Sequence, residues 1–377
     1  MNLRKGEMNR RSFIKVAGVA VASVATVGAL SACASDSESS DTPAPSGSET
    51  SGLTQATIGY WGGTPCELPM FIAREHNFFE EAGIDVNWLT ISSDTSILLA
   101  NSEIDCFMST PGDVPGLYNG MELKWLDNIH VGCWSGVALD DSIKTSADLT
   151  GKTVGINMIN GPAYVEANAL CDRLGGDSSQ INWVQYQGSL LQEALTNGEV
   201  DAIAAPDAYS YPIKEGTGAH FYYISAQDFG EYYCCFVGAN ANSLVAKPEL
   251  GDKLVVGMAK AVDYIKEDPI RACDEAIAAG YIADSFAEIQ RKLAVNYMFN
   301  HGNKSDFLAS VKERFAEFCD SGLMPDAPEE AGARSTYLDE WVTKVTEWHG
   351  DAVGAVETAD TEGTKAALAI RGDAYAS

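Results

Sequence analysis

Two successive blocks of alternating strand-like and helix-like segments constrain the fold of this 377-residue chain most. The first block runs from Thr57, and the second begins after Gly151. Each opens with an apolar strand and a glycine-containing loop, at Ile58-Gly59-Tyr60 and at Val154-Gly155-Ile156. Strands that alternate with helices form parallel βαβ units. The sequence therefore predicts an α/β protein with two similar lobes that face one another.

The expected elements follow the spacing of the apolar residues. Strands are predicted over residues 57–60, 85–90, 104–109, 124–129, 153–157, 182–186, 202–205 and 221–225. Helices are predicted over residues 68–82, 95–101, 162–174 and 189–197. A returning strand is expected over 235–245. Helices then follow over 253–348, with breaks near Pro269, Gly302 and Pro325.

The N-terminus has the pattern of a secretory signal. An apolar run of 15 residues, from Val16 to Leu30, is too short to cross a hydrocarbon core of roughly 30 Å as a helix. Arg10-Arg11-Ser12-Phe13-Ile14-Lys15 resembles the twin-arginine export motif, and Leu30-Ser31-Ala32-Cys33 resembles a bacterial lipobox. We therefore expect export and lipidation at Cys33, with a choice of start codon between Met1 and Met8 left open.

The segment after Cys33 is rich in Ser, Asp, Glu, Thr, Pro and Gly as far as Gly52, so it predicts a disordered tether. The chain carries 25 basic and 53 acidic residues, a net charge of −28. This acidity argues against nucleic-acid binding and against electrostatic adsorption to anionic lipid. The lipid on Cys33 is then the expected membrane attachment.

Motifs for catalysis and metal binding are absent from the sequence. It contains no Gly-x-x-x-x-Gly-Lys loop, no Gly-x-Ser-x-Gly elbow, no His-Glu-x-x-His helix and no Cys-x-x-Cys pair. We therefore predict no enzyme activity, no cofactor and no metal site. The cysteines after Cys33 are expected to be small buried residues, and their redox state is left open. They are Cys66, Cys106, Cys133, Cys171, Cys234, Cys235, Cys273 and Cys319.

Four local patterns resemble the solute-binding proteins of nitrate, sulfonate, taurine and thiamine-precursor ABC importers. They lie at residues 58–60 with 69–86, at Gly198-Glu199-Val200-Asp201-Ala202 with its echo Asn101-Ser102-Glu103-Ile104-Asp105, at 143–155, and at 262–269. The resemblance implies a hinged fold of the periplasmic-binding-protein type II class. Its crossover segments are expected at 131–141 and 231–245. The ligand would lie between the lobes, with an ABC permease and its ATPase as partners and a monomer as the expected state.

The resulting organisation has six parts. They are a signal peptide (1–32), a lipidated flexible tether (33–54), the first part of lobe 1 (55–135), lobe 2 (136–233), the return to lobe 1 with C-terminal helices (234–349), and an irregular or weakly helical tail (350–377). The expected location is the outer side of the cytoplasmic membrane.

Ligand-binding residues are expected in the loops that follow strands and in the crossovers, because open α/β sheets bind ligands at the carboxyl ends of their strands. They are Trp61, Gly62, Gly63, Thr64, Glu67, Thr110, Pro111, Asp113, Trp134, Ser135, Asn157, Asn160, Gly161, Ala163, Asp207, Tyr209 and Tyr232. Pro206-Asp207-Ala208-Tyr209 departs from a Glu-Pro-Tyr cluster that is frequent in the family.

These residues include carboxylates and aromatic rings but no Lys or Arg, which favours a neutral or cationic heteroaromatic ligand such as a pyrimidine. An anion such as sulfonate or nitrate, held at a helix N-terminus, is the first alternative. A second is a metal-binding or pyrimidine-synthase-like protein that uses Cys234 and Cys235, because an enzyme of related fold binds iron at a Cys-rich stretch. A third is a sensor that contacts a signalling partner.

Overall fold

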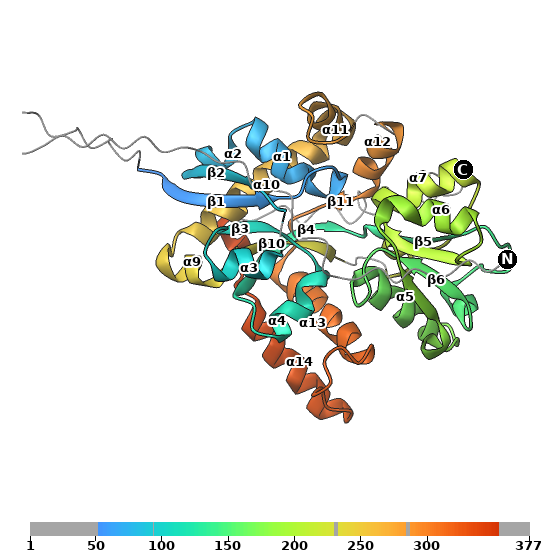
Figure 1. Ribbon diagram of the computed structural model, residues 1–377. Coiled ribbons are helices and arrows are strands. Elements are labelled where there is room, and N and C mark those ends of the chain that lie inside the picture. The colour runs from blue at the N-terminus through green and yellow to red at the C-terminus, as the bar shows by residue number, and fades with distance from the viewer. Residues whose placement is uncertain (1–51, 93, 230–232, 284–286, 354–377) are drawn as a thin grey trace, which may run out of the picture. The chain divides into compact units, whose positions relative to one another are not determined.

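The computed structural model describes residues 52–92, 94–229, 233–283 and 287–353, and the helices and strands lie in these ranges (Figure 1). The predicted signal peptide and the part of the tether that contains Cys33 lie outside the described residues, as do Tyr232 and residues 354–377. No helix in the described ranges combines the length and the apolar character needed to cross a membrane.

A first sheet has the strand order β11-β4-β10-β3-β1-β2. Its strands are β1 Thr54–Tyr60, β2 Ile84–Thr90, β3 Cys106–Ser109, β4 Leu123–Val131, β10 Tyr233–Asn240 and β11 Met298–Phe299. β1 pairs in parallel with β2 and β3, whereas β10 runs antiparallel between β3 and β4. A strand from late in the chain therefore lies at the centre of a sheet that begins near the N-terminus.

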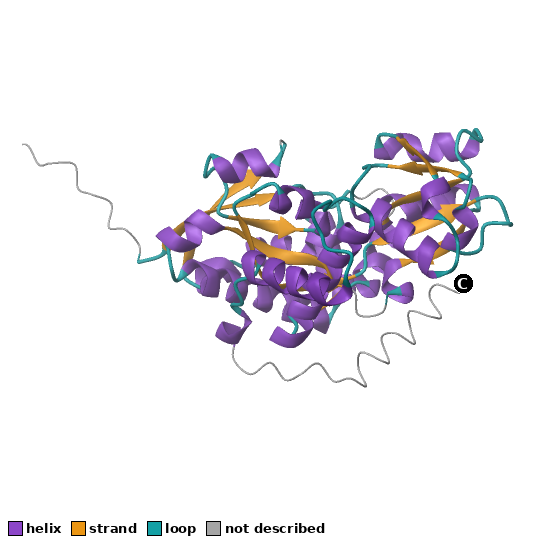
Figure 2. Ribbon diagram, turned by 90° about the horizontal axis from the view of Figure 1, so that it is seen from below, coloured by secondary structure: helices purple, strands orange, loops and turns teal. Residues whose placement is uncertain are grey.

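A second sheet has the order β7-β6-β8-β5-β9. Its strands are β5 Trp134–Ala138, β6 Thr153–Ile156, β7 Asn182–Gln185, β8 Ala202–Pro206 and β9 His220–Ile224. β6 is parallel to β7 and β8, and β5 is antiparallel to β8 and β9. Both sheets are mixed, and helices flank both (Figure 2). The predicted α/β class is confirmed.

Helices supply the remaining regular structure. Those that follow strands of the first sheet, or precede the second, are α1 Leu68–Glu75, α2 Phe78–Glu81, α3 Thr95–Ala100 and α4 Val114–Tyr118. Those within the second block are α5 Pro162–Arg173, α6 Leu191–Thr196, α7 Asp207–Thr217 and α8 Ser225–Asp228. The later ones are α9 Ala241–Ala246, α10 Leu250–Glu267, α11 Pro269–Ala278, α12 Ala287–Asn296, α13 Lys304–Asp320 and α14 Ala331–Val345. Short 3-10 turns are η1 Pro65–Glu67, η2 Pro111–Asp113, η3 Ser146–Leu149, η4 Ser178–Gln180, η5 Gly188–Leu190 and η6 Gly350–Val353.

The first sheet is buried on both faces. Along β10 the side chains alternate, so that Val237 packs in one apolar cluster with Phe71 of α1 and Leu254 of α10. Phe236 packs in the opposite cluster with Trp125 of β4 and Phe315 of α13. The second sheet is covered in the same manner, by α5 on one face and by α6 and α7 on the other. Burial on both faces explains why the inner strands β3 and β10 are buried along their whole length.

The chain passes between the sheets twice, as the resemblance implies. The first passage is Gly132-Cys133, between β4 and β5. The second lies between α8 and β10, and residues 230–232 within it are outside the described ranges. The lobe boundaries at 135/136 and 233/234 stay a prediction.

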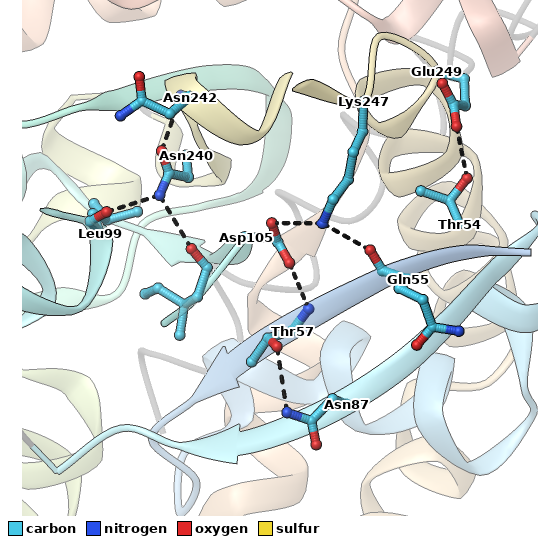
Figure 3. A network of polar contacts seen from close by, with 11 residues as sticks. Thr54, Gln55, Thr57, Asn87, Leu99, Asp105, Asn240, Asn242, Lys247 and Glu249 are labelled. Atoms are coloured by element: carbon cyan, nitrogen blue, oxygen red, sulfur yellow. Dashed lines mark hydrogen bonds and ion pairs between the residues drawn. The ribbon is translucent and has the colours of Figure 1, made fainter. Parts of the chain in front are cut away.

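Two predicted elements are wrong in part. The helix predicted over 68–82 is broken at Asn77, whose φ of 57° is left-handed, and α2 begins after it. The strand predicted over 235–245 ends at Asn240, because the Asn240 side chain accepts a hydrogen bond from the Asn242 N–H and starts α9 (Figure 3). The amide nitrogen of Asn240 donates to the carbonyls of Leu99 and Ile104, which ties this helix start to the first block.

The echoed motif has the same geometry in both sheets. Asp105 accepts a hydrogen bond from the Thr57 N–H at 2.7 Å and donates its own N–H to the Thr57 carbonyl at 2.8 Å. Asp201 makes the equivalent pair with Thr153, at 2.8 Å and 2.7 Å. In the first sheet Lys247 adds an ion pair to Asp105 at 3.0 Å (Figure 3). In both sheets the repeated motif therefore forms a pair of hydrogen bonds that joins a strand to the segment leading into its parallel neighbour.

Candidate ligand-binding site

The predicted site residues lie at the carboxyl ends of parallel strands in both sheets. Trp61, Gly62, Gly63 and Thr64 follow β1, and Thr110, Pro111 and Asp113 follow β3. Asn157, Asn160 and Gly161 follow β6, Ala163 lies in the first turn of α5, and Asp207 and Tyr209 begin α7 after β8. Since β1 neighbours β3 and β6 neighbours β8, each sheet brings two of these loops together. Trp134 and Ser135 open β5, beside the end of β8.

A loop from each sheet meets its counterpart at α5. A Cβ atom built on Gly112, in the turn after β3, would lie 3.3 Å from Cδ of Pro162, the first residue of α5. The two sets of loops therefore face the same region.

Glu67 serves the loop after β1 rather than facing outward. Its carboxylate is buried and accepts hydrogen bonds from the N–H groups of Trp61, at 2.9 Å, and Gly62, at 2.5 Å. Burial raises the pKa of this carboxyl to about 7, and these two hydrogen bonds lower it in part. Gly62 and Gly63 adopt left-handed φ angles of 78° and 93°, which fold the loop back over Glu67. Glu67 thus positions the backbone of the loop.

Asp113 has the same role in the loop after β3. Its carboxylate accepts hydrogen bonds from the Ser109 hydroxyl at 2.6 Å and from the Thr110 N–H at 3.2 Å. The Ser109 hydroxyl in turn accepts a hydrogen bond from the Trp125 indole at 2.6 Å. Burial raises the pKa of Asp113 to about 6. This loop is therefore held by a polar chain that begins in the core of the first sheet.

The N-terminus of α5 offers donors to a ligand. Gly161 is the N-cap and gives no side-chain cap, so the N–H groups of the first turn are available for an outside acceptor. The side-chain oxygen of Asn157 is buried without a hydrogen-bond partner in the described part of the chain. Asn160 is exposed and has a φ of 62°, which turns the loop into the helix.

Asp207 is the buried acid of the second sheet. Its carboxylate accepts a hydrogen bond from the Ser135 hydroxyl at 2.5 Å, and its N–H donates to the Cys133 carbonyl at 2.8 Å. Its charge also raises the pKa of the Cys66 thiol and of the Tyr297 hydroxyl, after burial as the main cause. Asp207 therefore lies close to residues of the first block as well as to β5.

Two aromatic rings near these loops keep an exposed surface. Trp61 is 42% exposed and rests edge-on against Phe107, with ring centroids 5.7 Å apart. Tyr209 is 40% exposed and lies over Gly188, where a Cβ atom would come within 2.5 Å of the ring. Trp134 is half-buried and donates its indole N–H to the Cys234 sulfur at 2.9 Å. Trp61 and Tyr209 are thus the predicted aromatic residues that present a ring surface.

The structure also gathers residues that the sequence did not bring together. Cys66, His130 and Cys133 place their ligand atoms within 4.8 Å of one another, and so do Cys133, Cys234 and Cys235. Cys133 and Cys234 are joined by a disulfide between the two passages of the chain. Cys234 and Cys235 are neighbours in β10, and the irregular pairing of β10 with β4 brings both sulfurs into one cluster, 3.8 Å apart.

This arrangement defines the class of protein. The described elements form the type II fold of periplasmic binding proteins, which three solved structures share. The alkanesulfonate-binding protein SsuA from Xanthomonas axonopodis pv. citri, bound to MOPS, is 14% identical with a TM-score of 0.60, over 75% of this chain and 99% of that one. The nitrate-binding protein NrtA from Synechocystis PCC 6803 is 14% identical with a TM-score of 0.61, over 81% and 89%. The aliphatic sulphonate-binding protein SsuA from Escherichia coli is 15% identical with a TM-score of 0.60, over 72% and 94%.

The family follows from the sequence itself. The family described as NMT1/THI5 like matches residues 64–272, more than half of the chain. No curated protein matches the sequence. The chain belongs to the NMT1/THI5-like family, which confirms the resemblance drawn from the local patterns.

Proposed function

We propose that this protein is an extracytoplasmic, lipid-anchored solute-binding protein that holds a small molecule between its two halves and delivers it to an ABC importer. The observation that carries the proposal is the meeting of loops from both sheets at α5, where a Cβ atom built on Gly112 would lie 3.3 Å from Pro162. Carboxyl ends of parallel strands are the usual ligand sites of open α/β sheets. Family membership and the solute-binding relatives support the same role, and a binding role requires no catalytic group.

The charge of the region supports a neutral or cationic ligand. Asp207 is buried beside Ser135 and Cys133, and the predicted site residues include no Lys or Arg. The exposed rings of Trp61 and Tyr209 offer surfaces on which a flat heteroaromatic ring or an organic cation can stack. We therefore propose a pyrimidine-like or amine ligand. The alternative is an anion at the N-terminus of α5, as two relatives bind alkanesulfonate and nitrate by their names.

A thermal-shift screen separates these ligands. The purified protein is heated with an aminopyrimidine, a set of primary amines, an alkanesulfonate and nitrate. A ligand present at 100 times its Kd stabilises the folded state by about 2.7 kcal/mol, which is a measurable rise in Tm. We expect the rise with an aminopyrimidine or an amine, and its loss in Asp207→Asn. A rise with the sulfonate alone would transfer the proposal to the anion alternative, and no rise with any compound would argue against the binding role.

Export and anchoring complete the proposal. The predicted twin-arginine signal and lipobox place the folded part outside the cytoplasmic membrane, tied to it by lipid on Cys33. The permease and its ATPase are the proposed partners, and the protein acts as a monomer. Hinge closure around the ligand would present both halves to the permease.

A metal-binding function is the second candidate, and the gathered thiols favour it. Cys66 and His130 come within reach of Cys133, which also adjoins Cys234 and Cys235. Thiolate and imidazole ligands suit Zn²⁺ and other borderline or soft metals. The disulfide uses Cys133 and Cys234, so only the reduced protein would offer the complete set.

Metal analysis of the reduced protein tests this candidate. Co²⁺ serves as the probe, because thiolate coordination gives it an intense absorption band. Binding of one Co²⁺ per chain that Cys235→Ser weakens would support the metal function. Cys273→Ser is the matched control, since Cys273 is also buried and free but lies in α11, outside both groups. Absence of the band in reduced protein would dismiss the candidate.

A further inference from the structure

The helix that carries part of the proposed site packs against α13. Ala163, in the first turn of α5, is a predicted ligand residue, and Glu166 follows it at the spacing that places two side chains on neighbouring turns. Val165 belongs to the apolar cluster of Phe307 and Val311 in α13. α5 and α13 are in contact, although α5 belongs to the second sheet and α13 covers the first (Figure 1).

A buried group of charges lies in this contact. Glu166 of α5 and Arg314 of α13 are both 0% exposed, and Glu317 is 6% exposed. The Arg314 guanidinium lies 3.4 Å from a carboxylate oxygen of Glu317 and 3.5 Å from one of Glu313. Neither carboxylate oxygen of Glu166 has a hydrogen-bond partner in the described ranges. Two carboxyl groups and one guanidinium are therefore buried in this contact.

Such a group favours an added proton. Burial raises the pKa of Glu166 well above its usual value, and the charge of Glu317 raises it further, while Arg314 lowers it in part. Burial raises the pKa of Glu317 to about 7. The surrounding groups do not remove the excess negative charge. Asp207 of α7 and Asp228 of α8 also raise the pKa of Glu166, the Tyr223 hydroxyl of β9 lies near it, and Arg173 of α5 and Glu313 of α13 act on the α13 side.

We propose that Glu166, Arg314 and Glu317 form a proton-linked contact between α5 and α13 that makes capture of ligand at the α5 N-terminus pH-dependent. This rests on the proposed function, because α5 and α13 separate only if the two halves open around the hinge. In the closed form Glu166 is buried and holds a proton. In the open form water reaches its carboxyl, whose pKa returns toward about 4.3.

Proton binding to the closed form determines the direction in which closure changes with pH. The closed form binds more protons than the open form between the pKa of the exposed carboxyl and that of the buried one, so closure is favoured as pH falls through this range and weakened as pH rises. A buried ion group contributes little to stability compared with apolar residues of the same volume, so a stabilising role alone does not account for it. Coupling of these charges to an opening motion would account for their burial.

Amide hydrogen exchange tests the contact without any ligand. The exchange rate of α5 peptides, corrected for the intrinsic rate at each pH, is compared with that of β10 peptides in the same purified chain. From pH 6 to pH 9 we expect α5 protection to fall by about tenfold or more, since one unit of pKa difference is a factor of ten in the equilibrium. Protection of β10 should stay constant.

Two matched variants identify the group responsible. Glu166→Gln mimics the protonated carboxyl, so its α5 protection should fall less between pH 6 and pH 9 than that of the unaltered chain, and the slope that remains comes from Glu317. Glu313→Gln also removes a carboxylate 3.5 Å from Arg314, but the Glu313 side chain is half-exposed, so this variant should keep most of the pH dependence of the unaltered chain.

Three results would overturn the proposal. They are a flat pH profile in the unaltered chain, an unchanged slope in Glu166→Gln, and a parallel loss of α5 and β10 protection in Glu166→Gln, which would make the group a support of the whole fold. Failure of the ligand screen leaves these readouts unaffected, so the two failures can be told apart.

Discussion

Gly136 of β5 lies beneath the buried ring of Tyr222, and this close approach fixes how β5 can pack. A Cβ atom at Gly136 would overlap the Tyr222 ring, whose hydroxyl donates a hydrogen bond to the Ile203 carbonyl at 3.1 Å. The ring cannot move without giving up that bond. We predict that Gly136→Ala lowers the free energy of unfolding by about 2–3 kcal/mol, as overpacking does elsewhere. Urea denaturation at neutral pH measures it.

Gly155→Ala is the matched control in the same sheet. Its Cβ atom would lie 3.3 Å from a methyl group of Val200, a flexible contact at the limit of ordinary packing. The expected loss is below about 1 kcal/mol, because a small shift of one side chain relieves the contact. Equal losses at Gly136 and Gly155 would show that the Tyr222 ring yields.

Glu67 makes a second prediction at the residue scale. Its pKa in the folded protein is raised to about 7 by burial, from a usual value of 4.5. The stability that protonation of this group contributes is fully present below pH 4.5 and is lost as pH rises through about 7. In Glu67→Gln the decline of stability between pH 5 and pH 8 should be smaller than in the unaltered chain. It should not vanish, because Asp113 and Glu317 are shifted in the same direction.

At pH 5 the same variant should be less stable than the unaltered chain. A Gln side chain has one acceptor oxygen, so one of the N–H groups of Trp61 and Gly62 is left buried without a bond, at a cost of about 1–3 kcal/mol. Glu81→Gln is the control, since Glu81 is on the surface and pairs with Lys260 at 2.8 Å. If the free energy of unfolding of Glu67→Gln changed with pH as steeply as that of the unaltered chain, the pKa assigned to Glu67 would be wrong.

The two copies of the repeated motif, each of which links a helix to a strand, place different residues at one left-handed position. The residue that ends the preceding helix is Gly198 in the second sheet, with a φ of 71°, and Ser102 in the first, with a φ of 56°. A left-handed residue other than glycine is strained by about 1–2 kcal/mol. We predict that Ser102→Gly raises stability by about 0.5–1 kcal/mol and that Gly198→Ser lowers it by about 1 kcal/mol. Thermal denaturation of both variants measures these changes, and each variant serves as the control for the other. A lower stability of Ser102→Gly would mean that the Ser102 side chain makes a compensating contact.

Elements defined by local pattern were predictable from the sequence, whereas those decided by distant partners were not. β1, β2 and β6 were predicted from the spacing of their apolar residues. The start of β8 was predicted because the turn residues of Gly198-Glu199-Val200-Asp201-Ala202 lie directly before it in the sequence. The break at Asn77 was missed, since a left-handed Asn leaves no strong signal within an amphipathic run. The end of β10 at Asn240 depends on the carbonyls of Leu99 and Ile104, about 140 residues earlier.

The candidate site also has features that could be predicted from the sequence and features that could not. Its loops could be placed because they follow predicted strands, but the direction of Glu67 and Asp113 could not, since both turn toward N–H groups of their own loops. The cluster of thiols was not predictable from spacing, because its residues come from three distant segments, which contain Cys66, His130 with Cys133, and Cys234. Glu166 and Arg314 gave no signal, as each reads as an ordinary helix charge until the packing of α5 against α13 buries it.

For the molecule as a whole, charge decides what can hold it at a membrane. Removal of residues 1–32 would take away five basic residues and one acidic residue, so the net charge of −28 would become about −32. A surface of this sign is repelled by anionic lipid, which otherwise attracts a protein by about 1 kcal/mol for each Lys or Arg near it. This charge therefore supports the proposal that a covalent lipid at Cys33 attaches the protein.

Replacement of Cys33 tests this attachment directly. In Cys33→Ala cells we expect the protein outside the cytoplasmic membrane but in the soluble fraction, whereas the unaltered chain and a Cys273→Ala control stay with membranes in high salt. Replacement of Arg10 and Arg11 together by Lys should instead keep the chain inside the cell, because export by the twin-arginine route requires the pair. If Cys33→Ala remained on membranes washed with salt, a protein contact, such as the permease, would hold it there, and the acidic surface would need a basic partner to explain that retention.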